Sequence, residues 1–317
     1  MIVYSDSKSQ ERDVFEYLGY YPKCDFILHH VFDDDWSTIP NRLDLPLLLW
    51  HAAEAFIEDT SEIKRDFVYV TGNYNLPCFF SIHDIISARI WPEKQWSSRK
   101  DKLFNCTQLK DVGHRRSVIA ALYKSGVLDR CNWSYVLNDS NDAWFDAALG
   151  FTEDDIVYAH SIDDIIPHNP YPVIGAHNQS LPDIWQDSCV TLCTETTFQH
   201  YRSQPVPLML TEKTYCAIAN LVMFIIAGPV GSLEMLKAQG YETFGDLWNE
   251  NYDNITNTAA RLRAVCALIE EVSKMDLPKL HAHCKERLLH NQDLLYSIDV
   301  KARVSKVTEW LTCVYKP

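Results

Sequence analysis

Two phosphate-binding signatures are missing from this sequence. The chain contains no GxGxxG segment and no GxxxxGK[ST] segment. The first of these cradles the pyrophosphate of a dinucleotide, and the second cradles the phosphates of ATP or GTP. Dinucleotide oxidoreductases and P-loop phosphotransferases therefore both lose their strongest support in the sequence.

Long apolar runs are missing as well. No stretch approaches the roughly 20 apolar residues that a membrane-spanning helix needs, so we predict no membrane span. The N-terminal segment MIVYSDSKSQERD carries charges where a signal peptide needs an apolar core. We therefore expect a cytoplasmic protein.

Positive charge is scarce, because 29 Lys and Arg stand against 43 Asp and Glu, for a formal net charge of −14. This balance argues against a protein whose affinity depends on a broad phosphate-binding surface. It leaves room for a local basic cluster, since charge can be concentrated where a ligand sits. The hydrophobic share of 47% is that of an ordinary soluble globular chain.

Cysteine is present ten times, but not with the spacing of a disulfide framework or a zinc site. No CxxC pair occurs, and most of the cysteines have apolar neighbours, so we expect reduced, buried thiols. The paired histidines at positions 29 and 30 and at 281 and 283 match no metal spacing. We predict no metal site.

Short β-rich segments alternate with helical ones along the chain. We predict strands at residues 2–5, 25–32, 66–73, 102–108, 133–138, 188–196 and 222–228. We predict helices at residues 114–129, 211–221 and 232–240, and an almost wholly helical chain from residue 256. Such an alternation is typical of parallel sheets with helices on both faces.

A polar stretch that ends in the Pro-rich segment IIPHNPYPVIG interrupts this rhythm and predicts a domain boundary. We therefore predict an α/β fold with two Rossmann-like domains that face a cleft, followed by a helical tail. The expected bounds are 1–140 and 188–275 for the two domains, 141–187 for the linker region and 276–317 for the tail. Ligands of such sheets bind outside the carboxyl ends of the strands, near the topological switch point.

An acid and a base follow Thr211 at the start of a predicted helix. If Thr211 is the N-cap, Glu212 lies in the first turn, where the helix dipole favours an acid. Lys213 opposes the dipole there, and an anionic ligand bound at the helix N-terminus would reverse that penalty. An ordinary solvated helix start is the alternative for Glu212.

Glu195, followed by Thr196, ends the strand that precedes this helix. Because the carboxyl ends of parallel strands share one edge of the sheet, we expect Glu195 near Glu212 and Lys213. A solvated loop acid is the alternative.

His114, Arg115 and Arg116 lie between a predicted strand and a predicted helix of the first half. Two arginines at a helix start again oppose the dipole, and guanidinium suits bidentate binding of phosphate. The alternative is a solvated turn in which one arginine pairs with an acid such as Asp111. The sequence does not choose between the two arginines.

Two blocks of the chain resemble a family of glycosyltransferase-like proteins carried by large DNA phages and viruses. One is KLFNCTQLKDVGHRRSVIAALYKSGVLDRCNWSY, and the other is SCVTLCTET followed by LTEKTYCAIANLVMFIIAGPVGSLEMLKAQGYETF and WNENYDN. The pairing of Glu195 with TEK is similar, more distantly, to the donor-binding domain of α1,3-fucosyltransferases. The blocks cover residues 102–135 and 188–254, under half of the chain.

This resemblance implies a two-domain glycosyltransferase of the GT-B type, hexosyl- or fucosyltransferase-like, which moves a sugar from a GDP- or UDP-linked donor to a hydroxyl without an obligatory metal or other cofactor. The N-terminal domain would then take the acceptor and the C-terminal domain the donor. Carried over by position, Glu195, Glu212 and Lys213 would hold the donor, and an arginine of HRR would neutralise its diphosphate. Thr196 stands where fucosyltransferases usually have asparagine, so the donor sugar stays open. A viral enzyme would work in the host cytoplasm.

An inverting transfer also needs a general base, normally a carboxylate of the acceptor domain. The candidates are Asp33, Asp34, Asp35 and Asp84, although a triplet such as DDD is more often a solvated turn. The acceptor is a glycan or small molecule, which the net charge favours, or a hydroxylated base of phage DNA. The alternative function is a degenerate nucleotide-sugar-binding protein that acts by sequestration or protein interaction.

Overall fold

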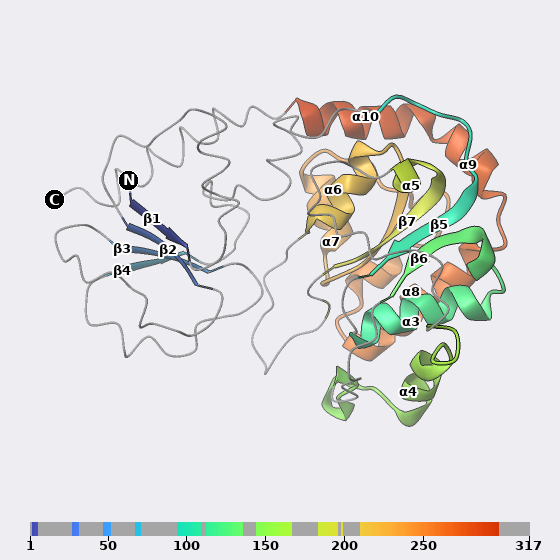
Figure 1. The fold of residues 1–317 in the computed structure, drawn as a ribbon, viewed down its shortest axis with the longest axis horizontal. Helices are drawn as coiled ribbons and strands as arrows, with labels where there is room; N and C mark the ends of the chain where they lie inside the picture. Colours follow the sequence, from blue (N-terminus) through green and yellow to red (C-terminus); the bar gives the residue numbers. More distant parts are fainter. Residues whose placement is uncertain are drawn as a thin grey trace. The chain divides into compact units, whose positions relative to one another are not determined.

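A computed structural model describes residues 2–5, 27–31, 47–51, 67–70, 94–108, 112–135, 144–166, 183–195, 198 and 210–297 of the chain. The chain divides into two compact units (Figure 1). The first unit comprises residues 1–88 and 298–317, and the second unit comprises residues 89–297. Both contain parallel strands, and helices are described in the second unit, so the predicted α/β class is confirmed.

The first unit holds a four-stranded sheet in the order β1-β2-β3-β4, in which every neighbouring pair is parallel. Its strands are β1 (Ile2–Ser5), β2 (Ile27–Val31), β3 (Leu47–His51) and β4 (Phe67–Val70). Three of them match predicted strands, whereas β3 was not predicted. Its sequence, LLLWH, is a short apolar run, and such a run looks alike in a buried strand and in a buried helix.

The second unit holds a parallel sheet in the order β6-β5-β7-β8. Its strands are β5 (Lys102–Thr107), β6 (Cys131–Ser134), β7 (Ser188–Thr194) and β8 (Met223–Ala227). Every residue of β7 and β8 is buried. Continuous burial of this kind is expected for a parallel sheet that is covered on both faces.

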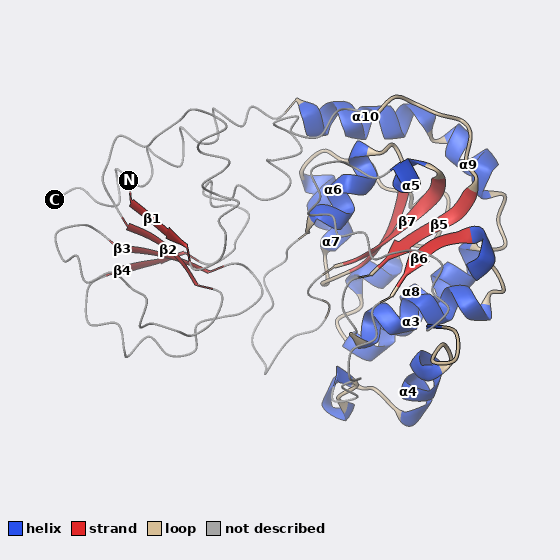
Figure 2. Ribbon diagram, viewed as in Figure 1, coloured by secondary structure: helices blue, strands red, loops and turns tan. Residues whose placement is uncertain are grey.

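Helices cover both faces of this second sheet (Figure 2). They are α3 (Gly113–Lys124), α4 (Glu153–His160), α5 (Asp183–Gln186), α6 (Glu212–Ala219), α7 (Ser232–Ala238), α8 (Thr258–Val272), α9 (Leu277–His283) and α10 (Lys285–Tyr296). On one side α3 packs against α8 and α4, and on the other α6 packs against α10. The predicted helical character after residue 256 is confirmed over α8, α9 and α10.

The division of the chain differs from the expected domain bounds. The expected linker at 141–187 would separate β5 and β6 from β7, but in the structure β5 pairs directly with β7, with Phe104 opposite Val190. The polar stretch contributes α4, which packs on α3, so part of it is an excursion within one α/β unit. A polar, Pro-rich loop within one domain has the same composition as a linker between two domains, and only the pairing of the strands distinguishes them.

The cysteines of the second unit confirm the expectation from their apolar neighbours. Those that the structure describes are buried thiols, and burial is the main cause that raises the pKa of Cys106 and Cys266 to about 12. Their contribution is therefore to packing.

Gly113 begins α3 at a point where its backbone meets two aromatic rings. A Cβ at this position would lie 2.2 Å from Cε3 of Trp144 and 2.9 Å from Cζ of Phe145. The two rings contact each other and Phe151, with ring centroids 5.1 to 5.4 Å apart. This aromatic cluster fixes the segment before α4 against the start of α3.

We expect Gly113→Ala to lower the free energy of unfolding by about 1–3 kcal/mol, because the added methyl group forces the Trp144 ring to move. Denaturant unfolding followed by tryptophan fluorescence measures the effect. Trp144→Leu in the same chain should recover part of the loss, since leucine leaves room for the methyl group. A Gly113→Ala protein as stable as the wild type would contradict this close packing.

Candidate functional site

The topological switch point of the second sheet lies between β5 and β7. From β5 the chain passes through α3 to β6 on one side, and from β7 it passes through α6 to β8 on the other. Ligands of open α/β sheets bind outside the carboxyl ends of the strands where the order reverses in this way. The N-termini of α3 and α6 follow β5 and β7, so both begin on this side of the sheet.

Hydrogen bonds join the residues that leave the sheet at this point. The hydroxyl of Thr194 donates to Oε1 of Gln108 at 2.7 Å, which links the ends of β7 and β5. The backbone N–H of Glu195 donates to the carbonyl of Ala227 at 2.9 Å, which links β7 to β8. The carboxyl edge of the sheet is thus held together by one continuous set of contacts.

Glu195 is fully buried, at 0% exposure, and its carboxylate faces the start of α6. Its Oε2 accepts the backbone N–H of Thr211 at 3.0 Å and also the Thr211 hydroxyl. Its Oε1 accepts the hydroxyl of Thr214 at 2.5 Å. The solvated loop acid that the sequence left open is therefore wrong, and Glu195 is an internal acceptor for the first turn of α6.

The start of α6 brings an ammonium group to the same place. Thr211 is the N-cap, as predicted, but its side chain makes no capping bond within the helix, because its hydroxyl donates to Glu195. That hydroxyl also accepts a hydrogen bond from Nζ of Lys213 at 3.2 Å. Carboxylate, hydroxyl and ammonium thus form a chain at a helix N-terminus, where a cation is disfavoured by the helix dipole.

His114, in the first turn of α3, lies against the carboxyl end of β7. Its Nε2 is 3.0 Å from the carbonyl oxygen of Glu195, and since a carbonyl only accepts, Nε2 carries the proton. The ring stacks on Phe198 at 5.1 Å between centroids and lies 5.4 Å from the ring of Trp144. His114 therefore ties α3 to the strand on the far side of the switch point.

Burial, and after it the positive charge of Arg115, holds the pKa of His114 well below its ordinary value. The charges of Lys213 and Arg261 lower the pKa further, so the ring is neutral at neutral pH. Three cations from α3, α6 and α8 thus act on one imidazole. These charges lie beside the buried carboxylate of Glu195, so both signs of charge meet at this edge of the sheet.

The two arginines of HRR have different surroundings. Nη1 of Arg116 is 2.8 Å from Nδ1 of His160 and 3.5 Å from Oδ1 of Asp163, so this arginine is engaged with the end of α4. Arg115 is buried, and its positive charge lowers the pKa of His114 and that of the Cys106 thiol on β5. Of the two arginines, Arg115 is therefore the one whose charge acts on His114.

Arg261 was missed in the sequence, although a usable signal was present. Asn257 is the N-cap of α8, and its side chain accepts the N–H of Ala260, so Arg261 comes at the end of the first turn. A positively charged side chain in the first turn of a helix opposes the helix dipole. The same criterion singled out Lys213 and the arginines of HRR.

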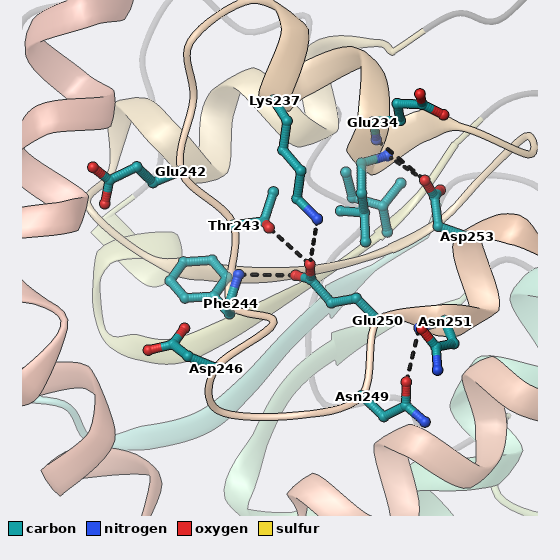
Figure 3. A network of polar contacts seen from close by, with 12 residues as sticks. Glu234, Lys237, Glu242, Thr243, Phe244, Asp246, Asn249, Glu250, Asn251 and Asp253 are labelled. Carbon is teal, nitrogen blue, oxygen red and sulfur yellow. Dashed lines mark hydrogen bonds and ion pairs between the residues drawn. The ribbon is translucent and has the colours of Figure 1, made fainter.

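The segment WNENYDN, which carries part of the family resemblance, is a structural anchor (Figure 3). Glu250 accepts hydrogen bonds from Lys237, Thr243 and the N–H of Phe244 at 2.7 to 3.0 Å. Oδ2 of Asp253 accepts the N–H groups of Leu233 and Glu234 at 3.1 and 3.2 Å, at the start of α7. Both acids therefore hold backbone segments that follow β8.

A cavity of about 480 Å³ lies between α3, α4 and α8. Its polar lining includes Asp154, Asp155, Glu270, Tyr158 and Arg263. Arg263 is already paired with Asp155 at 2.6 Å, and Glu270 accepts the hydroxyl of Tyr158 at 2.9 Å. The remaining charge is negative, which is the wrong sign for a phosphate ligand.

Several predicted site residues cannot be placed. The candidates for a general base, Asp33, Asp34, Asp35 and Asp84, lie outside the described residues, as does Thr196, and only the backbone of Glu212 is described. Within the described part of the chain, no group of three or more His, Cys, Asp or Glu side chains is arranged to hold a metal ion. The helices described there are all too short or too polar to cross a membrane.

Comparison of the chain with protein-family models, with curated proteins and with solved structures finds no match.

We expect Thr214→Val to lower the free energy of unfolding by about 1–3 kcal/mol, because a buried carboxylate loses one of its donors. Thr191→Val on β7 is the matched control. The Thr191 hydroxyl is buried and has no hydrogen-bond partner among the described groups, so valine should be neutral or stabilising there. Denaturant unfolding of both variants checks this, and equal losses would contradict the role given to Glu195.

Proposed function

We propose that the chain is a glycosyltransferase of the GT-B type, in which the second unit binds a GDP- or UDP-linked sugar and the first unit binds the acceptor. One observation carries the proposal: His114 at the start of α3 and Lys213 at the start of α6 both reach Glu195 at the carboxyl end of β7, His114 directly and Lys213 through Thr211. Two compact units, each with a four-stranded parallel sheet, are compatible with this architecture.

The charge that develops during sugar transfer explains why cations are useful at this place. When the bond between the sugar and the phosphate breaks, negative charge accumulates on the nucleoside diphosphate. Fixed cations and helix N-termini that already point at this charge lower the barrier, because no reorganisation is needed. In this proposal Lys213 and Arg115 face the diphosphate at the starts of α6 and α3.

Glu195 has a supporting part in the proposal. Its carboxylate accepts hydrogen bonds from Thr211 and Thr214. Thr211 in turn accepts from Lys213, so the position of the ammonium depends on Glu195. Glu195 therefore acts on the donor mainly by orienting Lys213.

For the general base of the reaction, the candidates remain the aspartates that the sequence suggested. Deprotonation of the acceptor hydroxyl is assigned to a carboxylate of the first unit, among Asp33, Asp34, Asp35 and Asp84. The acceptor is a glycan, a small molecule or a hydroxylated base of phage DNA. A protein that binds the nucleotide sugar without transferring it is the alternative.

We expect Lys213→Ala to weaken binding of GDP or UDP at least tenfold, about 1.4 kcal/mol, because a cation at the diphosphate is removed. Isothermal titration measures the affinities. Lys237→Ala is the control, since Lys237 lies in the same unit and pairs with Glu250. The assignment of Lys213 to the diphosphate site would be wrong if the wild-type chain bound neither nucleotide. It would also be wrong if the two variants bound the nucleotide with equal affinity.

The arginines of HRR give a second comparison. Arg115→Met should weaken the binding of the same nucleotide about as much as Lys213→Ala does, whereas Arg116→Met should mainly lower stability, since Arg116 holds His160 and Asp163. Titration and thermal unfolding of each variant separate the two effects. The opposite pattern would show that Arg116 is the arginine that faces the ligand.

Turnover distinguishes the enzyme from the binding protein. We expect release of GDP or UDP from at least one sugar donor, slowly to water and faster with the correct acceptor. Tight binding of a donor without release of nucleotide under any acceptor would favour the degenerate protein.

A further inference from the structure

Arg261 lies deeper in the protein than an arginine usually does. It is 2% exposed, its Nη1 donates to the carbonyl of Ile255 at 2.9 Å, and its Nη2 donates to the carbonyl of Phe198. Its guanidinium carbon lies 4.6 Å from the centre of the Phe198 ring. One side chain thus clamps the segment after β7 to the segment before α8.

Arg261 has no ion-pair partner within the part of the chain that the structure describes. Its Nε has no hydrogen-bond partner, and it forms no ion pair with any carboxylate, among the groups that the structure describes. Burial lowers the pKa of Arg261 to about 10, against an opposing influence of Asp253, so the group remains charged at neutral pH. A buried cation without a paired anion is costly, and an apolar side chain of similar size would fill the space without that cost.

The contacts of Arg261 lead directly to the switch point. Phe198, which Arg261 holds by its carbonyl and its ring, stacks on His114. His114 donates to the carbonyl of Glu195, whose carboxylate holds the start of α6. The charge of Arg261 acts on the same imidazole as those of Arg115 and Lys213. Arg261 therefore belongs to this cluster both by contact and by charge.

We infer that Arg261 is a positioning residue of an anion site at the switch point, and that the anion bound there is a diphosphate. Arg261 fixes Phe198 behind His114 and adds the third positive charge of the cluster. The inference rests on the proposed function for the nucleoside attached to the diphosphate, whereas the anion site itself is inferred from the burial of Arg261 and its contacts with Phe198.

Inorganic pyrophosphate is the probe that tests this inference without a nucleoside. By isothermal titration, Arg261→Met should bind pyrophosphate at least tenfold more weakly than the wild type. Arg261→Lys keeps the charge but loses the two-pronged contact with Ile255 and Phe198, so it should recover part of the affinity. A purely structural arginine would change the melting temperature and leave the affinity of the folded protein unchanged.

Arg287→Met is the matched control, because Arg287 also lies over a phenylalanine, 5.4 Å from the Phe244 ring, and its partner is Asp246 on the surface. It should bind pyrophosphate as the wild type does. If Arg261→Met does not fold, Arg261→Lys still tests the inference. Wild-type affinity for pyrophosphate in Arg261→Lys would overturn it.

Titration of GDP and UDP in parallel separates this inference from the proposed function. Binding of pyrophosphate that depends on Arg261, without binding of either nucleotide, would support the anion site and contradict the nucleotide-sugar donor. Binding of a nucleotide that is unaffected by Arg261→Met and Arg261→Lys would leave the proposed function standing and overturn the inference. A wild-type chain that binds none of the three would overturn both.

Discussion

The buried carboxylate of Glu195 is the interaction on which the candidate site depends. Its side chain accepts three hydrogen bonds from the first turn of α6, its carbonyl accepts one from His114 on α3, and its N–H donates to β8. One residue thus connects two helix N-termini with two strands at the switch point. A buried carboxylate is costly unless it is fully hydrogen-bonded, and the hydroxyls of Thr211 and Thr214 meet that requirement. Through Thr211, which also accepts from Lys213, Glu195 sets the position of the ammonium group at the start of α6.

Positive charge is gathered at this edge in a chain that is strongly acidic. Arg115, Lys213 and Arg261 come from three different helices, and each lies near the positive end of its own helix dipole. Neither local propensity nor the average composition favours this arrangement. In the proposed function, a diphosphate bound at two helix N-termini is the ligand that such an arrangement favours.

Much of this site was visible in the sequence, because it follows from local patterns. The apolar runs predicted β7 and β8, and the position of Thr211 predicted the start of α6. The domain bounds differed, because the pairing of β5 with β7 is a contact between distant segments, which no local pattern records. The choice between Arg115 and Arg116 was equally beyond the sequence, since it depends on His160 and Asp163 of the α4 region. Arg261 could have been found in the sequence, because the dipole criterion applies to it. Its contact with Phe198 could not, because Phe198 lies far away along the chain.

A crystal structure of the protein with GDP or UDP bound tests the central claim most directly. The account predicts the diphosphate at the carboxyl edge of the second sheet, between the N-termini of α3 and α6, with Lys213 and Arg115 in contact with its oxygens. A diphosphate bound anywhere else, for example in the acidic cavity between α4 and α8, would contradict the account.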